Sequence, residues 1–278
     1  MNEQKFIPEG WNEIEKEYTL KELNDAILNH NVLESTVKGF DKSNAYVSLC
    51  KGVTGIIPKE ELGIYNKKNK YVQFEVVGKN YEGFTLSRRK VQKDSLDWAI
   101  NELETGKTVN GIVRNIQPYG AFVEIGGGTV GLLHIEDISI ARMKTPEERL
   151  HVGQKIPVII KNVDKKEKKL NLSYKEFLGS WKDNVKDIVE GQKLQGIIRE
   201  TSKDKRGLFI ELKPNLVGMA EYKPNYEYGE KVKVIVKRII PEKEKIKLKI
   251  VKENAVNRDT SCWRVAKKLE LFAKRMRI

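Results

Sequence analysis

Large aromatic side chains recur on the polar side of three predicted strands. Tyr46, Phe122 and Phe209 each lie in a stretch of alternating apolar residues, at 44–49, 120–125 and 207–212. Because side chains in a strand alternate between two faces, the apolar neighbours fill the core and the aromatic ring points outward. An outward ring can stack on any unpaired base. The alternative is that each ring caps the core or packs on a neighbouring segment.

Lysines form a second pattern in the last third of the chain. Lys231 and Lys233 alternate with valines, and Lys245, Lys247 and Lys249 alternate with isoleucine and leucine. Two adjacent strands would then present lysines on one face, which attracts the phosphates of a nucleic acid. The alternative is a solvated sheet surface whose lysines block edge pairing.

The elements that carry these side chains occur in three copies. In each copy the aromatic strand is followed by a glycine that opens a second apolar strand, at Gly55, Gly131 and Gly218. Two more strands complete each copy, and a tryptophan in a polar, helix-like stretch precedes it. Short strands with glycine-rich turns in units of this size favour small barrels of the OB type. In the middle copy, residues 136–150 leave room for a helix with Thr145 as its N-cap, whereas the third copy has room only for a turn.

We therefore predict a mainly β protein of three tandem five-stranded OB-fold barrels, with short helical linkers and a basic C-terminal helix or tail. The predicted parts are an N-terminal helical segment (1–29), a first, degenerate OB domain (30–90), a linker helix (91–102), a second domain (103–177), a third, basic domain (178–251) and the tail (252–278).

The charge balance points to a polyanionic partner. The chain has 52 basic and 39 acidic residues. Residues 1–90 carry 14 basic and 13 acidic residues, residues 91–177 carry 13 and 12, and residues 178–278 carry 25 and 14, so +11 of the net +13 lies in the last third. A clustered positive field attracts phosphates.

Composition excludes several other classes. The chain has no apolar run of the ~18 residues that a membrane span needs and no signal peptide, so we predict a cytoplasmic protein without a membrane partner. Its two cysteines form neither a disulfide framework nor a metal-ligand cluster. The three histidines lack surrounding carboxylates, and no phosphate-cradling or dinucleotide motif is present. We expect no enzyme, no metal and no cofactor.

From about Leu103 to Tyr174, the middle copy resembles the RNA-binding domain of bacterial small-subunit ribosomal protein S-one, the S-one domain. The resemblance rests on residues 106–113, 119–123, 131–135, 152–156, 163–164 and 172–173, which follow the family pattern in order. The glycine tract at 126–128 is also similar to the S-one domain appended to polynucleotide phosphorylase.

The resemblance implies an RNA-binding face made of Tyr119, Phe122, His134, Asp164 and Lys169. Tyr119 stands where phenylalanine is common, and Lys169 where arginine is common. From the residues alone, strict alternation turns Tyr119 inward unless a bulge intervenes. His134 can equally be a structural residue, and Asp164 can equally be a turn former.

The flanking copies match this pattern less well. The first has Pro58 at the histidine position and keeps Tyr46 alone of the aromatic pair. We expect it to add little to RNA affinity and to dock a protein partner. The third keeps Phe209 but has Glu221 at the histidine position. The tail at 252–278 is basic and amphipathic, and it is open to three interpretations: a docking helix, a membrane-surface helix, or a disordered segment.

Together these patterns favour a single-stranded RNA-binding protein that resembles a short ribosomal protein S-one and holds mRNA at the small ribosomal subunit. The binding residues predicted in it are Tyr119, Phe122, His134, Asp164, Lys169, Phe209, Lys245, Lys247 and Lys249. The alternative is a non-catalytic adaptor that binds RNA non-specifically and docks a protein partner in RNA decay or transcription.

Overall fold

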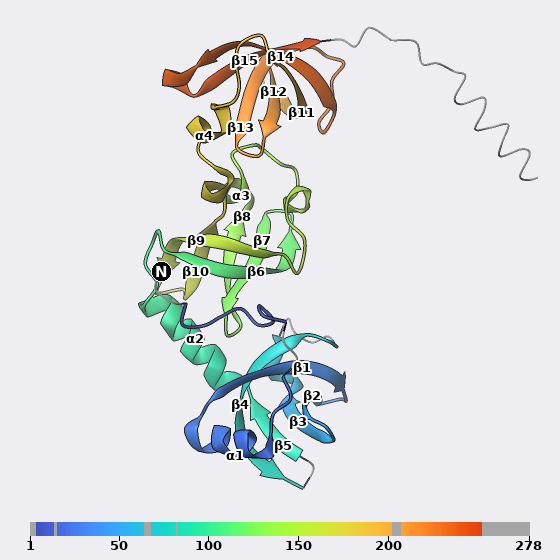
Figure 1. Cartoon of the computed structure of the whole chain (residues 1–278), viewed down its shortest axis with the longest axis vertical. Coiled ribbons are helices and arrows are strands. Elements are labelled where there is room, and N and C mark those ends of the chain that lie inside the picture. Colours follow the sequence, from blue (N-terminus) through green and yellow to red (C-terminus); the bar gives the residue numbers. More distant parts are fainter. Residues whose placement is uncertain (1–3, 14–15, 64–67, 82, 202–206, 252–278) are drawn as a thin grey trace, which may run out of the picture. The chain divides into compact units, whose positions relative to one another are not determined.

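A computed structural model describes residues 4–13, 16–63, 68–81, 83–201 and 207–251 of the chain (Figure 1). The strands form three closed five-stranded barrels, which confirms the predicted fold class. The chain divides into two compact units, Met1–Asn184 with the first and middle barrels and Val185–Ile278 with the third. The predicted tail at 252–278 lies outside the described residues.

The first barrel follows helix α1 (Leu20–Asn29), whose N-cap Thr19 forms a capping box with Glu22. Its strands are β1 (Val32–Phe40), β2 (Asn44–Cys50), β3 (Val53–Pro58), β4 (Tyr71–Asn80) and β5 (Gly83–Ser87), with a 3-10 turn at Lys59–Glu61. The strand order is β1-β2-β3-β5-β4, and β4 closes on β1. All pairs are antiparallel except β3 with β5.

The middle barrel has the same order and begins after helix α2 (Arg89–Asn101). Its elements are β6 (Thr108–Gln117), β7 (Gly120–Gly126), β8 (Thr129–His134), α3 (Ile135–Ile138), a 3-10 turn (Pro146–Glu148), β9 (Lys155–Asp164), β10 (Lys169–Ser173) and a second 3-10 turn (Lys175–Leu178). Trp98 of α2 packs into the core of this barrel.

The third barrel repeats the topology after the short helix α4 (Trp181–Val185). Its strands are β11 (Lys193–Thr201), β12 (Gly207–Lys213), β13 (Leu216–Glu221), β14 (Lys231–Ile240) and β15 (Lys245–Val251), with a 3-10 turn at Pro241–Lys243.

The alternating residues fill the barrels as their spacing predicts. In β2 and β7 all three apolar positions are completely buried, and in β12 Leu208 and Ile210 are buried while Leu212 is half-buried. The opposite parity places Tyr46, Phe122 and Phe209 on the outer face, where each ring is half-buried.

Two helix predictions differ from the structure. Over residues 136–150 the structure has only the four-residue helix α3, which begins at Ile135, and a single 3-10 turn. Thr145 is the N-cap of this turn, as predicted, and forms a capping box with Glu148. Between α3 and this turn, Ser139 Oγ accepts a hydrogen bond from Ala141 N, a local bond that competes with helix formation. In the segment predicted as helical from residue 1 to 29, α1 is the helix found among the described residues 4–13 and 16–29, and Trp11 lies in a bend.

The N-terminal segment, residues 4–13, contacts both barrels of its unit. The side chain of Gln4 bridges β6 and β7, because its Oε1 accepts from Asn110 N of β6 (2.8 Å) and its Nε2 donates to Ile125 O of β7 (2.6 Å). The ring of Phe6 lies 5.5 Å from that of Trp98. A Cβ at Gly126 would lie 2.5 Å from Phe6 O, so the glycine permits this close approach.

The same segment completes a buried charged cluster, the Glu9 cluster, which consists of Glu9, Glu34, Arg88, Arg114 and Glu124. Arg88 Nη2 donates to Glu9 Oε1 at 2.6 Å, and Glu9 N donates to Glu124 Oε1 at 3.0 Å. Arg114 Nε donates to Glu124 Oε2 at 3.0 Å, and Gly10 N donates to Glu34 Oε2 at 3.0 Å. Buried charges of this kind are tolerated only when they are paired.

Three carboxylates face two guanidinium groups in the Glu9 cluster, so one negative charge is in excess. Burial raises the pKa of Glu9 to about 7, the Arg88 guanidinium opposes the rise, and the neighbouring Glu124 carboxylate reinforces it. Burial also raises the pKa of Glu34. Glu9 Oε2 is buried without a hydrogen-bond partner in the described part of the chain, as expected of an incompletely compensated carboxylate.

The Glu9 cluster predicts that stability falls as pH rises. The pKa of Glu9 is higher in the folded chain (about 7) than its ordinary value of 4.5, so folding takes up a proton. The resulting stabilisation is complete below pH 4.5 and is lost as pH rises through 7. We expect Glu9→Gln to unfold like the wild type at pH 5 and to be more stable by about 1 kcal/mol or more at pH 8. Urea unfolding at both pH values measures this difference, and a parallel pH profile of the two proteins contradicts it.

Candidate nucleic-acid interface

The register of the middle barrel aligns five outward side chains in one row across its strands. Asn115 of β6 lies opposite Phe122 of β7, which lies opposite Leu132 of β8; the row continues to Asn171 of β10 and Asn162 of β9. All five side chains are exposed or half-buried. An aromatic ring and three amides therefore share one surface, the middle row.

Tyr119 extends the middle row on the side of Phe122. The two rings meet edge to face, with centroids 6.3 Å apart and planes at 86°, and Tyr119 is 50% exposed. Tyr119 points outward because it lies in the turn between β6 and β7, where strand alternation does not apply. The neighbouring Gly120 allows the close strand pairing that places this turn, since a Cβ there would lie 2.5 Å from Leu133 O.

His134 lies at the end of β8, opposite Gly120. Its Nδ1 accepts a weak hydrogen bond from Glu136 N at 3.4 Å, which caps α3. The side chain is still 45% exposed. His134 therefore has a structural role and a solvent-accessible edge at the border of the predicted face.

Asp164 and Lys169 lie opposite each other where β9 turns into β10. Asp164 Oδ1 accepts from Lys166 N (3.0 Å) and Glu167 N (2.9 Å), so this carboxylate shapes the turn. Lys169 is exposed, and its Nζ lies 3.4 Å from the Glu167 carboxylate. The turn-forming alternative is thus realised at Asp164, and the RNA contact of both residues stays a prediction.

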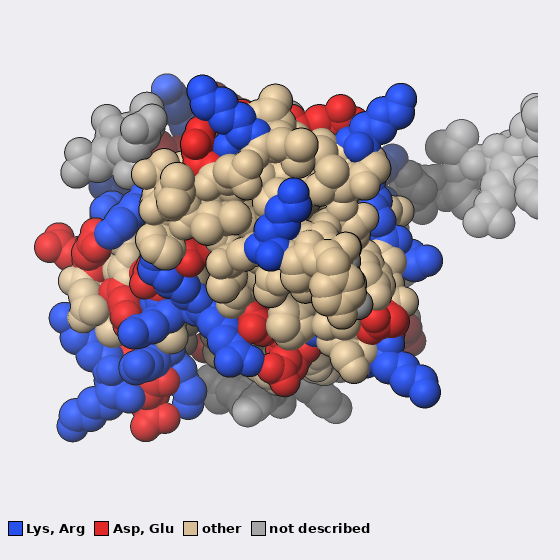
Figure 2. Space-filling model, turned by 90° about the horizontal axis from the view of Figure 1, so that it is seen from below, with Lys and Arg blue, Asp and Glu red and all other residues tan. Residues whose placement is uncertain are grey.

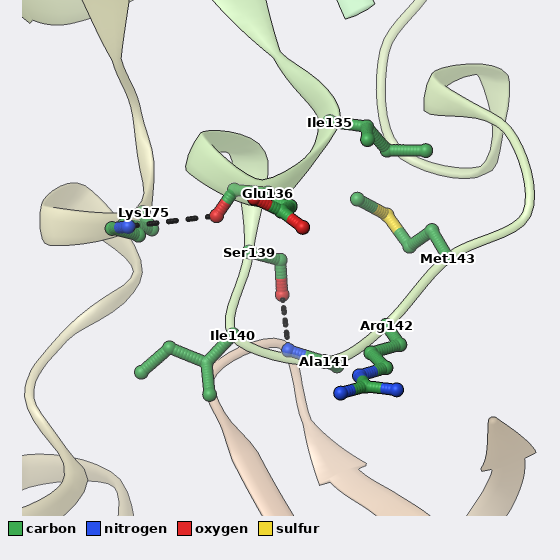
Figure 3. Close-up of a pocket in the computed structure, with 8 residues that line it drawn as sticks. All are labelled: Ile135, Glu136, Ser139, Ile140, Ala141, Arg142, Met143 and Lys175. Atoms are coloured by element: carbon green, nitrogen blue, oxygen red, sulfur yellow. Dashed lines mark hydrogen bonds between the residues drawn. The ribbon is translucent and has the colours of Figure 1, made fainter. Parts of the chain in front are cut away.

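A hollow of about 580 Å³ adjoins α3 (Figure 3). Its lining side chains are Ile135, Glu136, Ser139, Ile140, Ala141, Arg142, Met143 and Lys175. Lys175 also donates to Asp137, as does Lys161 from β9. Burial raises the pKa of Asp137, but the hydrogen bonds from Lys161 and Lys175 outweigh this and lower its pKa overall. The charge of Lys175, one of the two basic residues that line the hollow, is thereby partly neutralised.

The third barrel has an equivalent row of different chemistry. Glu200 of β11 lies opposite Phe209 of β12, followed by Met219 of β13, Lys247 of β15 and Arg238 of β14. Met219 is 43% exposed. Both rows thus contain a phenylalanine. Beside it, the third barrel has a methionine and two cations at the positions where the middle barrel has a leucine and two asparagines.

The predicted lysine face is present on β14 and β15. Lys231, Lys233, Lys245, Lys247 and Lys249 are exposed, and the apolar residues that alternate with them in β15 are buried. The two strands pair over most of their length. Glu221 is exposed at the end of β13, and its carboxylate lies 3.7 Å from Lys237 Nζ, so its charge is partly balanced.

The first barrel has little binding chemistry in the equivalent row. Gly39, Tyr46, Ile56, Thr85 and Gly78 occupy the five positions. Tyr46 Oη donates to Asp41 Oδ2 at 2.6 Å, which fixes the ring against the turn before β2. The hydrogen bonds from Tyr46 and then from Asn44 and Ser43 lower the pKa of Asp41 to about 2.

Sequence reasoning missed one pair of contacts. Glu124 and Glu211 share the outward parity of the aromatics, yet both are buried. Arg114 and Arg199, from the preceding strands, hold them in ion pairs. The recurrence of an arginine and a glutamate at matching positions of two copies was the available signal.

Within the described ranges, no group of three or more His, Cys, Asp or Glu side chains is placed to bind a metal ion. None of the described helices combines the length and apolar character that a membrane span requires.

Comparison with known proteins identifies the class of the site. A family model described as the S1 RNA binding domain matches residues 102–175, which contain the whole middle barrel. The chain is thus a tandem-barrel protein of the RNA-binding class. It is 30% identical over 267 residues to the small ribosomal subunit protein bS1 homolog of Bacillus cereus, with 86% of this chain and 69% of that protein covered. The chain belongs to the bS1 family.

Other relatives share this similarity over most of the chain. The small ribosomal subunit protein bS1 of Staphylococcus epidermidis is 26% identical over 282 residues, covering 90% of this chain and 69% of that protein. A protein of Clostridium acetobutylicum named 4-hydroxy-3-methylbut-2-enyl diphosphate reductase is 29% identical over 270 residues. The match covers 86% of this chain but spans only 40% of the reductase.

The geometry of the middle row predicts a stacking contact. Phe122→Ala should weaken the binding of single-stranded RNA by about 1–3 kcal/mol and leave its salt dependence almost unchanged, because no phosphate contact is lost. Fluorescence anisotropy at several salt concentrations measures both quantities. The matched control is Tyr46→Ala in the first barrel, which should leave affinity unchanged. If Phe122→Ala lowers only the melting temperature, the ring is a packing residue.

Loss of the lysine face should change the salt dependence of RNA binding, which Phe122→Ala should leave almost unchanged. Replacing Lys245, Lys247 and Lys249 together by Gln should flatten the slope of log affinity against log salt by up to about 0.7 for each phosphate contact removed. The control removes the same charge from exposed positions near the first barrel, Lys21, Lys42 and Lys51. Equal effects of the two triple variants indicate a general field effect and refute a local phosphate contact.

Proposed function

We propose that this protein binds single-stranded RNA through the outer rows of its middle and third barrels and holds mRNA at the small ribosomal subunit. The observation that carries the proposal is the ring pair of the 50% exposed Tyr119 and the half-buried Phe122 on the outer face of the middle barrel. Two rings that meet edge to face offer one ring face to an unpaired base, which is unavailable inside a duplex.

The two barrels contribute different forces in this proposal. The middle barrel supplies stacking, with Tyr119 and Phe122 as the platform and His134 and Lys169 at its border. The third barrel supplies Phe209 and the lysine face with Lys245, Lys247 and Lys249, which follow the RNA backbone. Stacking and backbone attraction are both tolerant of sequence, as expected of a protein that holds many different messages.

The first barrel serves docking in this proposal. Its outer row carries glycines where the other barrels carry amides or charges, and residues 1–90 have nearly balanced charge. On the face drawn in Figure 2, acidic and basic side chains are interspersed around a mostly uncharged central area that also carries a basic side chain. A protein surface of the ribosomal subunit suits this barrel better than an RNA backbone does.

The bS1 relatives support the ribosomal assignment, and we propose that the protein acts in the cytoplasm without catalysis. The reductase name is that of a relative more than twice as long as the matched region.

Strand preference is the first test of this function. We expect an unstructured RNA oligonucleotide to bind at least tenfold more tightly than a blunt RNA duplex of equal length, because stacking needs unpaired bases. Competition anisotropy against one labelled oligonucleotide measures the ratio. Equal affinities contradict the proposal.

Co-sedimentation with purified small ribosomal subunits tests the ribosomal part. The full chain should pellet with the subunits in dilute salt, and Phe122→Ala should still pellet, because docking uses the first barrel. A chain that binds RNA but fails to pellet instead supports the adaptor hypothesis.

A further inference from the structure

Two equivalent positions in the outer row carry different side chains in each of the three barrels, although the strands pair there in the same way. The positions lie directly opposite each other on the last two strands of each outer row. They hold Gly78 and Thr85 in the first barrel, Asn162 and Asn171 in the middle barrel, and Arg238 and Lys247 in the third. The fold therefore accommodates three different pairs at these two positions: a glycine with a threonine, two asparagines, or an arginine with a lysine.

The two amides of the middle barrel, the amide pair, are available to a ligand. Asn162 is exposed and Asn171 is half-buried. Neither side-chain amide has a hydrogen-bond partner among the residues that the structure describes. Residues directly opposite on antiparallel strands have Cβ atoms about 4.5–5.5 Å apart, so both amides can reach one flat group.

The amide pair lies on the same surface as the stacking ring. Leu132 of β8 is the single residue between Phe122 and Asn171 in the row. Neighbouring strands are about 4.8 Å apart, so Asn171 lies about 10 Å from Phe122 across the sheet. Leu132 is half-buried and offers an apolar floor between them.

Asn115, at the other end of the row, is less suited to recognition. Its Oδ1 already accepts a hydrogen bond from Ile116 N at 2.9 Å. This bond occupies one of the two lone pairs of its Oδ1 and ties the side chain to the backbone of β6, whereas both amides of the pair keep all their donors and acceptors.

An amide with both groups available matches the edge of a base. Asn and Gln pair with adenine through two hydrogen bonds, whereas Arg and Lys pair with guanine or contact phosphate. Single-stranded RNA exposes these edges because its bases are not paired. A neutral pair carries no charge that attracts phosphate, so its contribution should depend little on salt concentration.

We propose that Asn162 and Asn171 read the edge of an adenine whose neighbour stacks on Phe122, which makes the middle barrel the base-selective part of the protein. This inference rests on the proposed function. The Arg238 and Lys247 pair of the third barrel, at the matching positions, contacts phosphate without regard to base.

The test uses RNA probes that keep stacking and change only the base edge. The reference probe is a uridine oligonucleotide with two central adenosines, and the second probe carries purine riboside at those sites, which lacks the exocyclic amino group. We expect the wild type to bind the adenosine probe roughly fivefold or more tightly than the purine riboside probe. In Asn162→Ala/Asn171→Ala this ratio should fall to about one, while the purine riboside probe binds as it does to the wild type.

Two further variants separate the possible causes. Asn101→Ala, at an exposed position at the end of α2, is the matched control and should keep the wild-type ratio. Asn162→Arg/Asn171→Lys reproduces the third barrel, and it should lose the adenosine preference while its salt slope steepens by up to about 0.7 for each new phosphate contact.

The outcomes distinguish this inference from the proposed function. If the wild type binds both probes equally, or if the alanine variant keeps the preference, the amide pair does not read adenine, although RNA binding stands. If the alanine variant loses affinity for both probes to the same extent, the amides act on the backbone or the fold, and the inference is again wrong. If Phe122→Ala leaves both affinities unchanged, the stacking platform itself fails.

Discussion

A β-bulge in the first strand of each barrel is the constraint on which the outer rows depend. In all three barrels the pairing of the first two strands shifts by one residue just before the aromatic position, between Val37 and Gly39, Val113 and Asn115, and Ile198 and Glu200. The shift brings Gly39, Asn115 or Glu200 opposite the aromatic ring. A bulge also increases local twist, which helps five short strands close into a barrel.

The residue inside the bulge has its own consequence. Arg114 and Arg199 occupy this position in the middle and third barrels, and each forms an ion pair with a buried glutamate of the next strand, Glu124 or Glu211. The first barrel has Lys38 and Ser48 at these positions and lacks the pair. In the middle barrel, Glu124 also accepts a hydrogen bond from Glu9 N of the N-terminal segment. Glu124 therefore connects β6 and β7 to the Glu9 cluster. Glu124 thus takes part both in the pairing of β6 with β7 and in the anchoring of the N-terminal segment.

A common scaffold allows the three barrels to differ in what they offer a ligand. The core residues of β2, β7 and β12 are interchangeable apolar side chains, and the outer rows are not constrained by packing. Substitution on the outer face costs little stability, so it can change a row from amides to cations without disturbing the fold. This separation of core and surface explains how one chain can carry three barrels with the same core and with different side chains on their outer rows.

The sequence by itself determined the number of barrels, their inner and outer faces and the outward position of Phe122 and Phe209, because strand alternation is a local property of the chain. It also determined the lysine face, since one pattern on two neighbouring strands needs no further information. The helix predicted at 136–150 is much shorter in the structure, and Ser139 Oγ accepts a local hydrogen bond from Ala141 N in that segment. The sequence pattern also left open whether Tyr119 points inward or outward. Only the tertiary structure decided that Tyr119 points outward from a turn, that Asp164 shapes one, and that Asn162 and Asn171 lie opposite each other on the surface that carries Phe122. Tyr119 and Asp164 lie in or beside turns, where strand alternation does not decide the direction of a side chain. The place of Asn162 and Asn171 beside Phe122 depends on register between paired strands, and a one-residue shift in register would place such a side chain on the other face.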